Sequence, residues 1–464
     1  MRSIACVSAV ILLAACRTST PDPAPLAVPD HGVIGVGAAQ LDPGFWVGLQ
    51  SAPERVILTP AAIAQQNRAM LDRDSSLYDL ERLPATLTQD QVRRWVAGLS
   101  HAPSRQLFDE HGDSVTAARI AGLVDSAQVD AIPASQPLRF GLVTARADLR
   151  TFPTRLRVFT TPGYTDIDRW QETALFPGTP LVIVHASRDG QWWFVVSQHY
   201  AAWIEKSRVA EGPRDVVLGY GRRTPYLVVT GASVRTVFTP EQPAVSELRL
   251  EMGVRVPLLA DWPDGRPVNG QNPYTGRVIE LPTRGADGSL ALVPALLPPN
   301  ADVATDYLPL TAAGIVRQSF KFLGERYGWG HSYGGRDCSG FVSEVYRSFG
   351  VDLPRNTGDQ AVSPALNRVH LTEADNAAHR DSVLRQTQVG DLIYIPGHVM
   401  MVIGHWQDMT YVIHDVVGIS YKGQNGSLVR VPLNGVSVTP FTPLMAGPER
   451  TFADIVTNIQ RVRP

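Results

Sequence analysis

The residues from Glu325 to Gly350, ERYGWGHSYGGRDCSGFVSEVYRSFG, constrain the fold of this chain more than any other stretch. A loop rich in glycine and aromatic residues leads to Asp337 and Cys338, and an apolar run follows them. The spacing of that run is typical of one buried helix face: Phe341, Val342, Val345, Tyr346 and Phe349. Asp337 stands at an N-cap position and Gly350 near the C-terminal end. We therefore predict a buried helix whose first turn carries Cys338.

A cysteine in that position has two interpretations. The free N–H groups and the positive dipole end of the helix favour a thiolate, and such a setting can lower the pKa of Cys338 from its ordinary value of ~8.5. The alternative is a small, inert core residue, which is the commoner fate of a lone cysteine. The rest of the chain has to decide between them.

The first residues predict an exported lipoprotein. Arg2 precedes the apolar segment Ile4–Ala14, which is too short to span a bilayer. Leu13-Ala14-Ala15-Cys16 resembles a lipoprotein signal, so residues 1–15 are predicted to be removed and Cys16 to carry the lipid. The alternative is an ordinary signal peptide with a chance cysteine near its end.

The same assignment leaves one thiol in the mature chain. Cys6 leaves with the signal peptide and Cys16 is lipidated, so Cys338 has no partner for a disulfide. A lone thiol in an oxidising compartment is a candidate reactive group. Residues 16–31 are rich in Pro, Ser and Thr and predict a tether. Arg17 is not the aspartate of an inner-membrane retention signal, which favours the periplasmic face of the outer membrane, or otherwise the cell envelope.

Length and patterning predict a multidomain α+β protein. A chain of 464 residues is too long for a single core, and a net charge of −2 gives no sign of nucleic-acid binding. We expect a helical stabilising region at 32–133, with helices starting at Thr59-Pro60 and at Thr88. Short alternating strands with turn signals predict two small β-barrels, at 134–212 and 213–306. The first resembles a bacterial SH3 domain. The final domain is expected at 307–464.

A nucleophilic thiolate needs a base, and the base needs an orienting partner. His398 and His414 lie in two successive strand-like segments, and adjacent antiparallel strands can bring them side by side. His370 and His379 lie in a polar connection, and His405 ends its strand, so these three are less well placed.

The final domain resembles the NlpC/p60 cysteine peptidases. The matching segments are RYGWG, GRDCSGFV, LPRNT, GDLIYI followed by GHVMMVIG, and YVIHDV, in that order over about 155 residues. The upstream order of a stabilising region and two SH3-like domains resembles one subgroup of that family. The resemblance implies a papain-like fold, with the cysteine on a helix and the histidines on an antiparallel sheet.

The resemblance also implies roles for particular residues. Cys338 would be the nucleophile, His398 the general base and then acid, and His414 the group that orients His398. Tyr327 would line the oxyanion hole and the cleft, where the backbone N–H of Cys338 also contributes. Three further residues match substrate-binding positions: Asp337, Ser339 and Thr357.

Several of these residues have simpler interpretations. Asp337 can be only a helix cap, Tyr327 can be only loop packing, and His414 can be only a buried strand histidine. Thr357 stands where the subgroup often has serine, and His331 replaces a common glycine, which puts the loop shape in doubt. From the first SH3-like domain we name Asp168 and Tyr200 as candidates for a wall at one end of the cleft.

The function implied by the resemblance is hydrolysis of the bond between γ-D-glutamate and a diamino acid, meso-diaminopimelate or L-lysine, in murein peptides. A wall at the cleft would select released peptides with a free N-terminal L-alanine, hence murein recycling. We expect no metal, because no His, Glu or Cys cluster has ligand spacing. We also expect no cofactor, and a monomer. The alternatives are a murein-binding lipoprotein with an inactive peptidase domain, and an amide or acyl transferase on the same fold.

Overall fold

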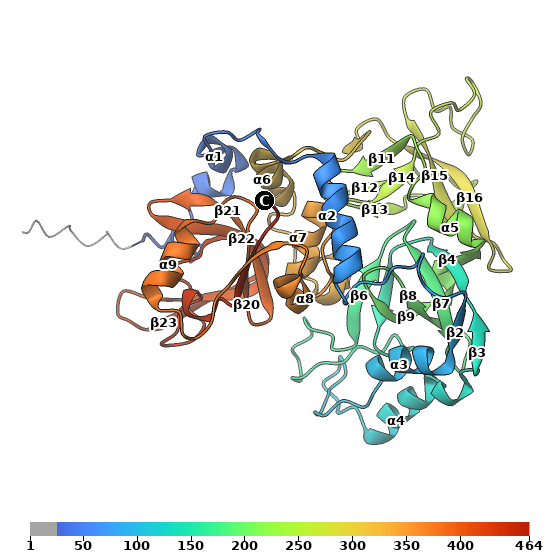
Figure 1. Ribbon diagram of the computed structural model, residues 1–464, viewed down its shortest axis with the longest axis horizontal. Helices are drawn as coiled ribbons and strands as arrows, with labels where there is room; N and C mark the ends of the chain where they lie inside the picture. The colour runs from blue at the N-terminus through green and yellow to red at the C-terminus, as the bar shows by residue number, and fades with distance from the viewer. Residues whose placement is uncertain (1–25, 464) are drawn as a thin grey trace, which may run out of the picture.

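A computed structural model of the chain describes residues 26–463 (Figure 1). The predicted signal peptide, the lipidation site Cys16 and the tether up to residue 25 lie outside the described residues. From residue 26 to residue 463, every helix is too short or too polar to cross a membrane.

The N-terminal region contains the two helices expected from its capping signals. Thr59 caps α2 and Thr88 caps α3 through its side-chain oxygen. The elements of this region are α1 (Pro43–Gly48), β1 (Val56–Leu58), α2 (Pro60–Arg73), β2 (Thr86–Thr88), α3 (Gln89–Leu99) and α4 (Ala117–Ser126), with the 3-10 turns η1 (Ala38–Leu41) and η2 (Val129–Ala131).

The buried residues of this region do not form a separate core. They contribute to the cores of two neighbouring domains. Trp46 of α1 and Met70 of α2 are buried in the core of the C-terminal domain. Val92 and Val96 of α3 are buried in the core of the first β-domain. Figure 1 shows α2 standing between the two halves of the molecule. The region thus holds domains together.

The first β-domain is one antiparallel sheet with the order β10-β4-β7-β8-β9-β5-β6. Its strands cover the segment in which we predicted the first barrel: β4 (Arg139–Val143), β5 (Ala147–Arg150), β6 (Gln171–Leu175), β7 (Pro180–Ala186), β8 (Trp192–Val196), β9 (Ala201–Glu205) and β10 (Val209–Gly212). β3 (Ser135–Pro137) pairs with β2 beside it, and η3 (Lys206–Arg208) joins β9 to β10. The apolar residues Phe194 and Trp203 are fully buried between its strands.

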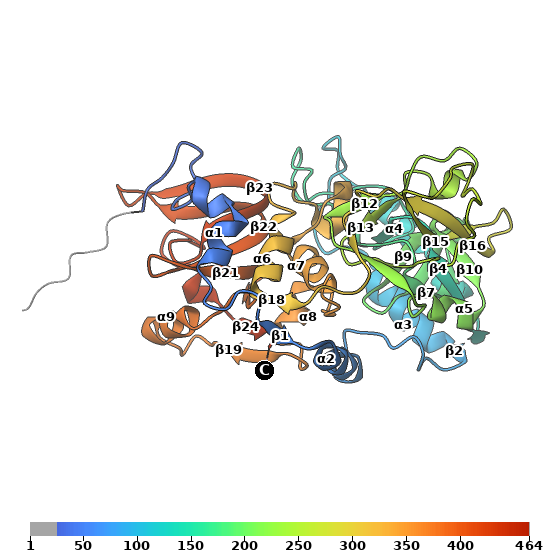
Figure 2. The same ribbon diagram turned by 90° about the horizontal axis from the view of Figure 1, so that it is seen from above.

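The second β-domain consists of three small sheets, with one main core and a smaller apolar cluster of Val268, Val278 and Leu296. Its elements are α5 (Arg214–Tyr220), β11 (Tyr226–Val229), β12 (Ser233–Arg235), η4 (Pro243–Val245), β13 (Arg249–Glu251), β14 (Arg255–Pro257), β15 (Arg277–Arg284), β16 (Leu290–Leu297) and β17 (Val303–Ala304). The long hairpin β15–β16 projects from it, as Figure 2 shows at the end far from the C-terminal domain.

The C-terminal domain packs helices against an antiparallel sheet with the order β19-β24-β20-β21-β22-β23. Its helices are α6 (Ala312–Phe320), α7 (Cys338–Arg347), α8 (Thr357–Val362) and α9 (Ala377–Arg385), with the 3-10 segments η5 (Trp329–Gly334) and η6 (Ala453–Ile455). Its strands are β18 (Leu310–Thr311, paired with β1), β19 (Asn367–His370), β20 (Leu392–Ile395), β21 (His398–Trp406), β22 (Met409–Lys422), β23 (Leu428–Pro440) and β24 (Asn458–Arg461). Helix α7 packs on β21 and β22, so the predicted buried helix lies against the strands that begin or contain the two candidate histidines.

Candidate active site

Cys338 is the first residue of α7, as its sequence signals predicted. Asp337 caps the helix, and its carboxylate accepts a hydrogen bond from the Gly340 N–H at 2.8 Å. The thiol lies 3.6 Å from the hydroxyl of Thr357 at the start of α8. Cys338 is 6% exposed and is the one free cysteine among residues 26–463. The capped helix end therefore fixes the sulfur at the edge of the core.

The surroundings of this sulfur correct one expectation. Burial raises the pKa of Cys338 to about 11, and the charge of the neighbouring Asp337 carboxylate acts in the same direction. Hydrogen bonds from Thr357 and from the backbone N–H of Val399 act in the opposite direction without prevailing. The thiol is thus protonated at neutral pH, and the site has to remove its proton during the reaction.

Two histidines on neighbouring strands supply a proton acceptor: His414 is fully buried, and His398 is half-buried at the start of β21. His398 Nε2 and His414 Nδ1 are 2.8 Å apart, and His414 Nε2 is 3.0 Å from the Thr439 hydroxyl. Burial lowers the pKa of His398 to about 4 and that of His414 well below its ordinary value. When His414 donates to Thr439 and accepts from His398, the other ring nitrogen of His398 carries a free lone pair. That nitrogen is a neutral base at pH 7.

The position of Val399 brings this base to the cysteine. Val399 directly follows His398 at the start of β21, and its N–H faces the Cys338 sulfur. The beginning of β21 therefore lies beside the beginning of α7. This arrangement places a thiol near an imidazole that is hydrogen-bonded to a second imidazole.

Asp337 has more partners than a helix cap needs. Its second carboxylate oxygen accepts from the Arg355 guanidinium at 2.8 Å and from the Gly330 N–H at 3.0 Å. Although burial acts to raise it, the pKa of Asp337 is lowered to about 2 by the Arg355 charge and these hydrogen bonds. Arg355 also donates to the hydroxyls of Ser339 and Thr173, at 2.8 and 2.6 Å. One guanidinium thus joins the helix start to the first β-domain.

The loop before α7 is held in an unusual backbone conformation. His331 has φ +65°, in the left-handed region, and its buried ring lies 3.0 Å from a carboxylate oxygen of Glu344. Gly340 makes room for that ring, because a Cβ at Gly340 would lie 2.5 Å from a ring carbon of His331. The departure at His331 is therefore accommodated by packing within the C-terminal domain and against Thr173 and Phe176 of the first β-domain.

Tyr327 lies in the same loop, close to Cys338 and Asp337. It is 7% exposed, and burial next to Cys338 and Asp337 raises its pKa, so its phenol stays protonated. Its backbone N–H donates to the Asn434 carbonyl oxygen, which fixes the start of the loop against β23. A neutral phenol at this place is suited to donate a hydrogen bond to a bound carbonyl group.

The first β-domain brings a carboxylate to the same region. The Tyr200 hydroxyl donates to Glu172 at 2.5 Å, and Thr151 donates to the other oxygen of that carboxylate. Glu172 forms no ion pair with any described residue, and its backbone carbonyl lies 3.0 Å from where a Cβ of Gly330 would stand. Tyr200 and Glu172 thus place beside η5 a carboxylate that has two hydroxyl donors and no ion pair among the described residues.

Asp168, our other candidate for that wall, has a different environment. Its carboxylate is 1% exposed, pairs with Arg150 at 2.6 Å, and accepts from the N–H groups of Val158 and Trp170. All of these partners belong to the first β-domain. The structure therefore gives Asp168 a role in holding its own loop.

Comparisons with known proteins agree with this geometry. A model of the NlpC/P60 family matches residues 324–437, and a model of an SH3 domain of the SH3b1 type matches residues 157–205. The C-terminal domain is an NlpC/P60 domain. The chain is accordingly a hydrolase of the cysteine-peptidase type, with the predicted SH3-like domain before it.

Individual relatives agree with this assignment. The chain is 24% identical over 265 residues to a γ-D-glutamyl-L-lysine dipeptidyl-peptidase of Bacillus cereus, covering 49% of this chain and 72% of the relative. It is 44% identical over 52 residues to the Bacillus subtilis protein of that name, covering 11% of this chain and 18% of the relative. An NlpC/P60 endopeptidase from Photobacterium damselae subsp. piscicida has the same fold, with a TM-score of 0.72 at 16% identity over 90% of this chain and 96% of that one.

Sequence reasoning missed two residues of the candidate site. Arg355 lies in the LPRNT segment, so its motif was visible, but the reason for its charge lies in Asp337 and Thr173. Glu172 has no signal in the sequence, because β6 reads QETAL like many other strands. Across residues 26–463, no three His, Cys, Asp or Glu side chains gather as metal ligands would.

Proposed function

We propose that this protein cleaves the bond between γ-D-glutamate and the diamino acid, meso-diaminopimelate or L-lysine, of murein peptides. The observation that carries the proposal is the position of Cys338 at the capped start of α7, beside the start of β21 and its His398–His414 pair. The names of the Bacillus relatives, γ-D-glutamyl-L-lysine dipeptidyl-peptidases, support the choice of bond.

In the proposed reaction His398 takes the thiol proton as the Cys338 sulfur attacks the γ-carbonyl carbon. The resting pair is neutral, since the pKa of Cys338 is raised and that of His398 is lowered, so proton removal accompanies the attack. The oxyanion accepts hydrogen bonds from the Cys338 N–H and from the Tyr327 phenol. His414 keeps the lone pair of His398 directed at the thiol.

The second half returns the enzyme to its starting state. The C–N bond breaks as His398 gives its proton to the leaving amine of the diamino acid, which leaves a thioester on Cys338. Water then attacks the thioester while His398 takes one of its protons. The products are a peptide ending in the free γ-carboxyl of D-glutamate and the regenerated thiol.

The amino end of the substrate is proposed to lie against Glu172 and Tyr200, with Asp337 and Ser339 close by. A free α-ammonium group has the charge and the donors that the unpaired Glu172 carboxylate requires. An L-alanine still attached to the glycan has no such charge. The protein would therefore act on released peptides, outside the cytoplasm, in recycling of murein. We also propose anchoring through Cys16 at the outer membrane.

The test is product analysis with L-Ala-γ-D-Glu-meso-diaminopimelate, its L-lysine counterpart, and the N-acetylated form of each. We expect L-Ala-D-Glu and the free diamino acid as products, neither of them with Cys338→Ala, and at least tenfold weaker cleavage of the acetylated peptides. Glu172→Gln is expected to raise KM for the free peptides. It should therefore reduce the difference in cleavage between the free and the acetylated peptides. Cleavage that survives in Cys338→Ala would reject the proposed nucleophile. A product joined to an added amine acceptor would instead indicate a transferase.

A further inference from the structure

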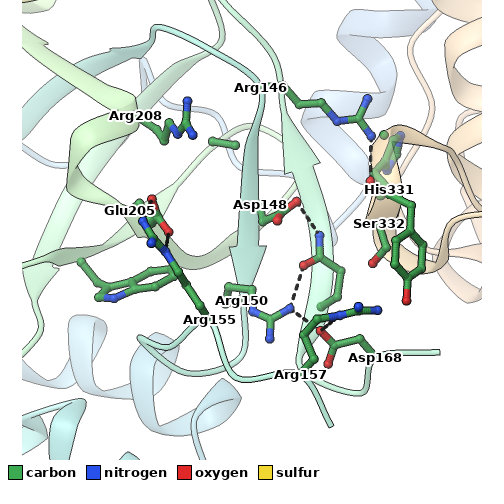
Figure 3. A pocket seen from close by; sticks show the side chains of 15 residues that line it. Arg146, Asp148, Arg150, Arg155, Arg157, Asp168, Glu205, Arg208, His331 and Ser332 are labelled. Carbon is green, nitrogen blue, oxygen red and sulfur yellow. Dashed lines mark hydrogen bonds and ion pairs between the residues drawn. The ribbon is translucent and has the colours of Figure 1, made fainter. Parts of the chain in front are cut away.

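A cavity of about 630 Å³ lies on the face of the first β-domain that meets η5 (Figure 3). Its walls come from β5, the loop between β5 and β6, β9, η3 and residues 331–334 of η5. Cys338, Asp337 and Tyr200 do not line it. The cavity is thus separate from the candidate active site, although η5 belongs to both.

Positive charge predominates in this cavity. Five guanidinium groups line it: Arg146, Arg150, Arg155, Arg157 and Arg208. Three carboxylates do so: Asp148, Asp168 and Glu205. An excess of two positive charges is therefore enclosed by the walls, and Figure 3 shows the arginines spread around the cavity.

Three of the arginines are held by partners in the protein. Arg150 pairs with Asp168 in the buried floor, and Arg155 pairs with Glu205. Arg146 donates to Glu251 at 2.6 Å and to the His331 carbonyl oxygen at 2.7 Å. Of these three, only Arg146 contacts other domains, through Glu251 and the η5 segment, whereas the other two pairs lie within the first β-domain.

The other two arginines, Arg157 and Arg208, have N–H donors that the described part of the chain does not use. Arg208 makes no side-chain hydrogen bond or ion pair with any residue from 26 to 463, and it is exposed. Arg157 lies 3.8 Å from Asp168, has one long hydrogen bond of 3.4 Å to the Thr165 carbonyl, and stacks over the Tyr333 ring at 4.5 Å. Stacking fixes the plane of the Arg157 guanidinium while leaving N–H groups unused.

We propose that this cavity is a binding site for a doubly charged anion, one with a phosphate group or two carboxylates. A planar guanidinium presents paired N–H donors that match the oxygens of both groups, and two such groups match two negative charges. Murein peptides carry carboxylates and other envelope polymers carry phosphate, so the chemistry is common to both sources. Binding at this site does not require the proposed peptidase activity.

The experiment is calorimetric titration of the full chain with inorganic phosphate and, separately, with succinate, each at ionic strength matched with sodium chloride. We expect saturable binding of at least one of the two. Phosphate alone would point to a phosphate-bearing polymer, and succinate alone to a murein peptide. Arg157→Gln with Arg208→Gln is expected to weaken that binding at least tenfold. Absence of saturable binding of both anions would overturn the proposal.

Two further variants keep the test decisive. Arg208→Gln alone changes an exposed side chain without packing partners, so it folds even if loss of the Arg157 stacking disturbs the domain; we expect it to weaken binding severalfold. Arg188→Gln, on the same domain and outside the cavity, removes an exposed guanidinium paired with Asp125 and is expected to bind like the wild type. Binding that is unchanged in Arg208→Gln, or equally weakened in Arg188→Gln, would reject the site.

Discussion

His398 and His414 share a hydrogen bond of 2.8 Å between Nε2 and Nδ1, and the Thr439 hydroxyl lies at the far nitrogen of His414. This chain of three groups occupies the place where many cysteine and serine hydrolases use a carboxylate. Desolvation lowers the pKa of both imidazoles, the fully buried His414 and the half-buried His398, so both are neutral and interact through a hydrogen bond and not as an ion pair.

Replacing His414 with alanine should lower kcat about 10- to 100-fold with little change in KM, because His398 loses the partner that fixes its tautomer and ring orientation. His414→Asn should retain more activity than His414→Ala, since the amide can still accept a hydrogen bond. Steady-state kinetics on the free tripeptide measures both. His405→Ala is the matched control on β21, since His405 bonds to the Thr387 carbonyl. An unchanged kcat in His414→Ala would contradict the orienting role.

Alkylation of Cys338 by iodoacetamide should be slow at pH 7 and should rise about tenfold per pH unit toward a midpoint near 11. The reason is that only the thiolate reacts, and burial together with Asp337 raises the pKa of this thiol to about 11. The measurement is the rate of modification against pH, with urea-unfolded protein as the control, which should show a midpoint near ~8.5. A plateau reached below pH 8 in the folded protein would contradict this prediction.

Asp337→Asn should move that midpoint to lower pH. Asparagine still caps α7, but it removes the negative charge beside the thiol and leaves the Arg355 cation uncompensated. The expected effect is faster alkylation at a fixed pH of 8, seen by mass spectrometry of the modified peptide. Slower alkylation in this variant would show that the carboxylate acts on Cys338 mainly through the shape of the loop.

Local signals predicted the helix with Cys338, because an N-cap, an apolar face and a following glycine are all set by neighbours within about ten residues. The pKa of the same cysteine was predicted in the wrong direction. The helix dipole can be read from the sequence, whereas burial under β21 and α8 depends on tertiary packing.

The contacts of the wall show the same limit. Arg355 donates to Thr173, which is 182 positions away in the sequence. The backbone of Glu172 packs against Gly330 of η5, which belongs to another domain. Asp168 and Tyr200 looked alike as polar residues of one domain, yet one closes an internal ion pair and the other contacts Glu172. Sequence patterns found the domains and the cysteine–histidine set, and only the packing between domains located the rest.

Asp415 should make the protein less stable as the pH rises from about 4 to 9. It is fully buried, and neither carboxyl oxygen has a hydrogen-bond partner in the described part of the chain. Burial raises its pKa to about 9, as do the charges of Asp337 and Glu325, while Arg336 opposes them. A raised folded pKa gives stability that is fully present below the unfolded value of ~3.9 and is lost as pH rises toward 9.

Asp415→Asn keeps the neutral form at every pH. We therefore expect it to be more stable than the wild type by about 1–3 kcal/mol at pH 9, with the difference shrinking toward pH 4. Urea unfolding of both proteins at several pH values measures this. A difference that is constant across the range would mean that Asp415 does not titrate on folding.

Gly340→Ala should destabilise the NlpC/P60 domain by about 1–3 kcal/mol, because the added Cβ would lie 2.5 Å from the His331 ring, which is fixed by Glu344. In a His331→Gly background the same substitution meets no ring, and its cost should fall to below about 1 kcal/mol. Thermal or urea unfolding of the four proteins forms a double-mutant cycle. Gly358→Ala, in α8 with open space around it, is the control and should be neutral or slightly stabilising. Equal costs of Gly340→Ala in both backgrounds would show that the ring of His331 does not occupy the space at Gly340.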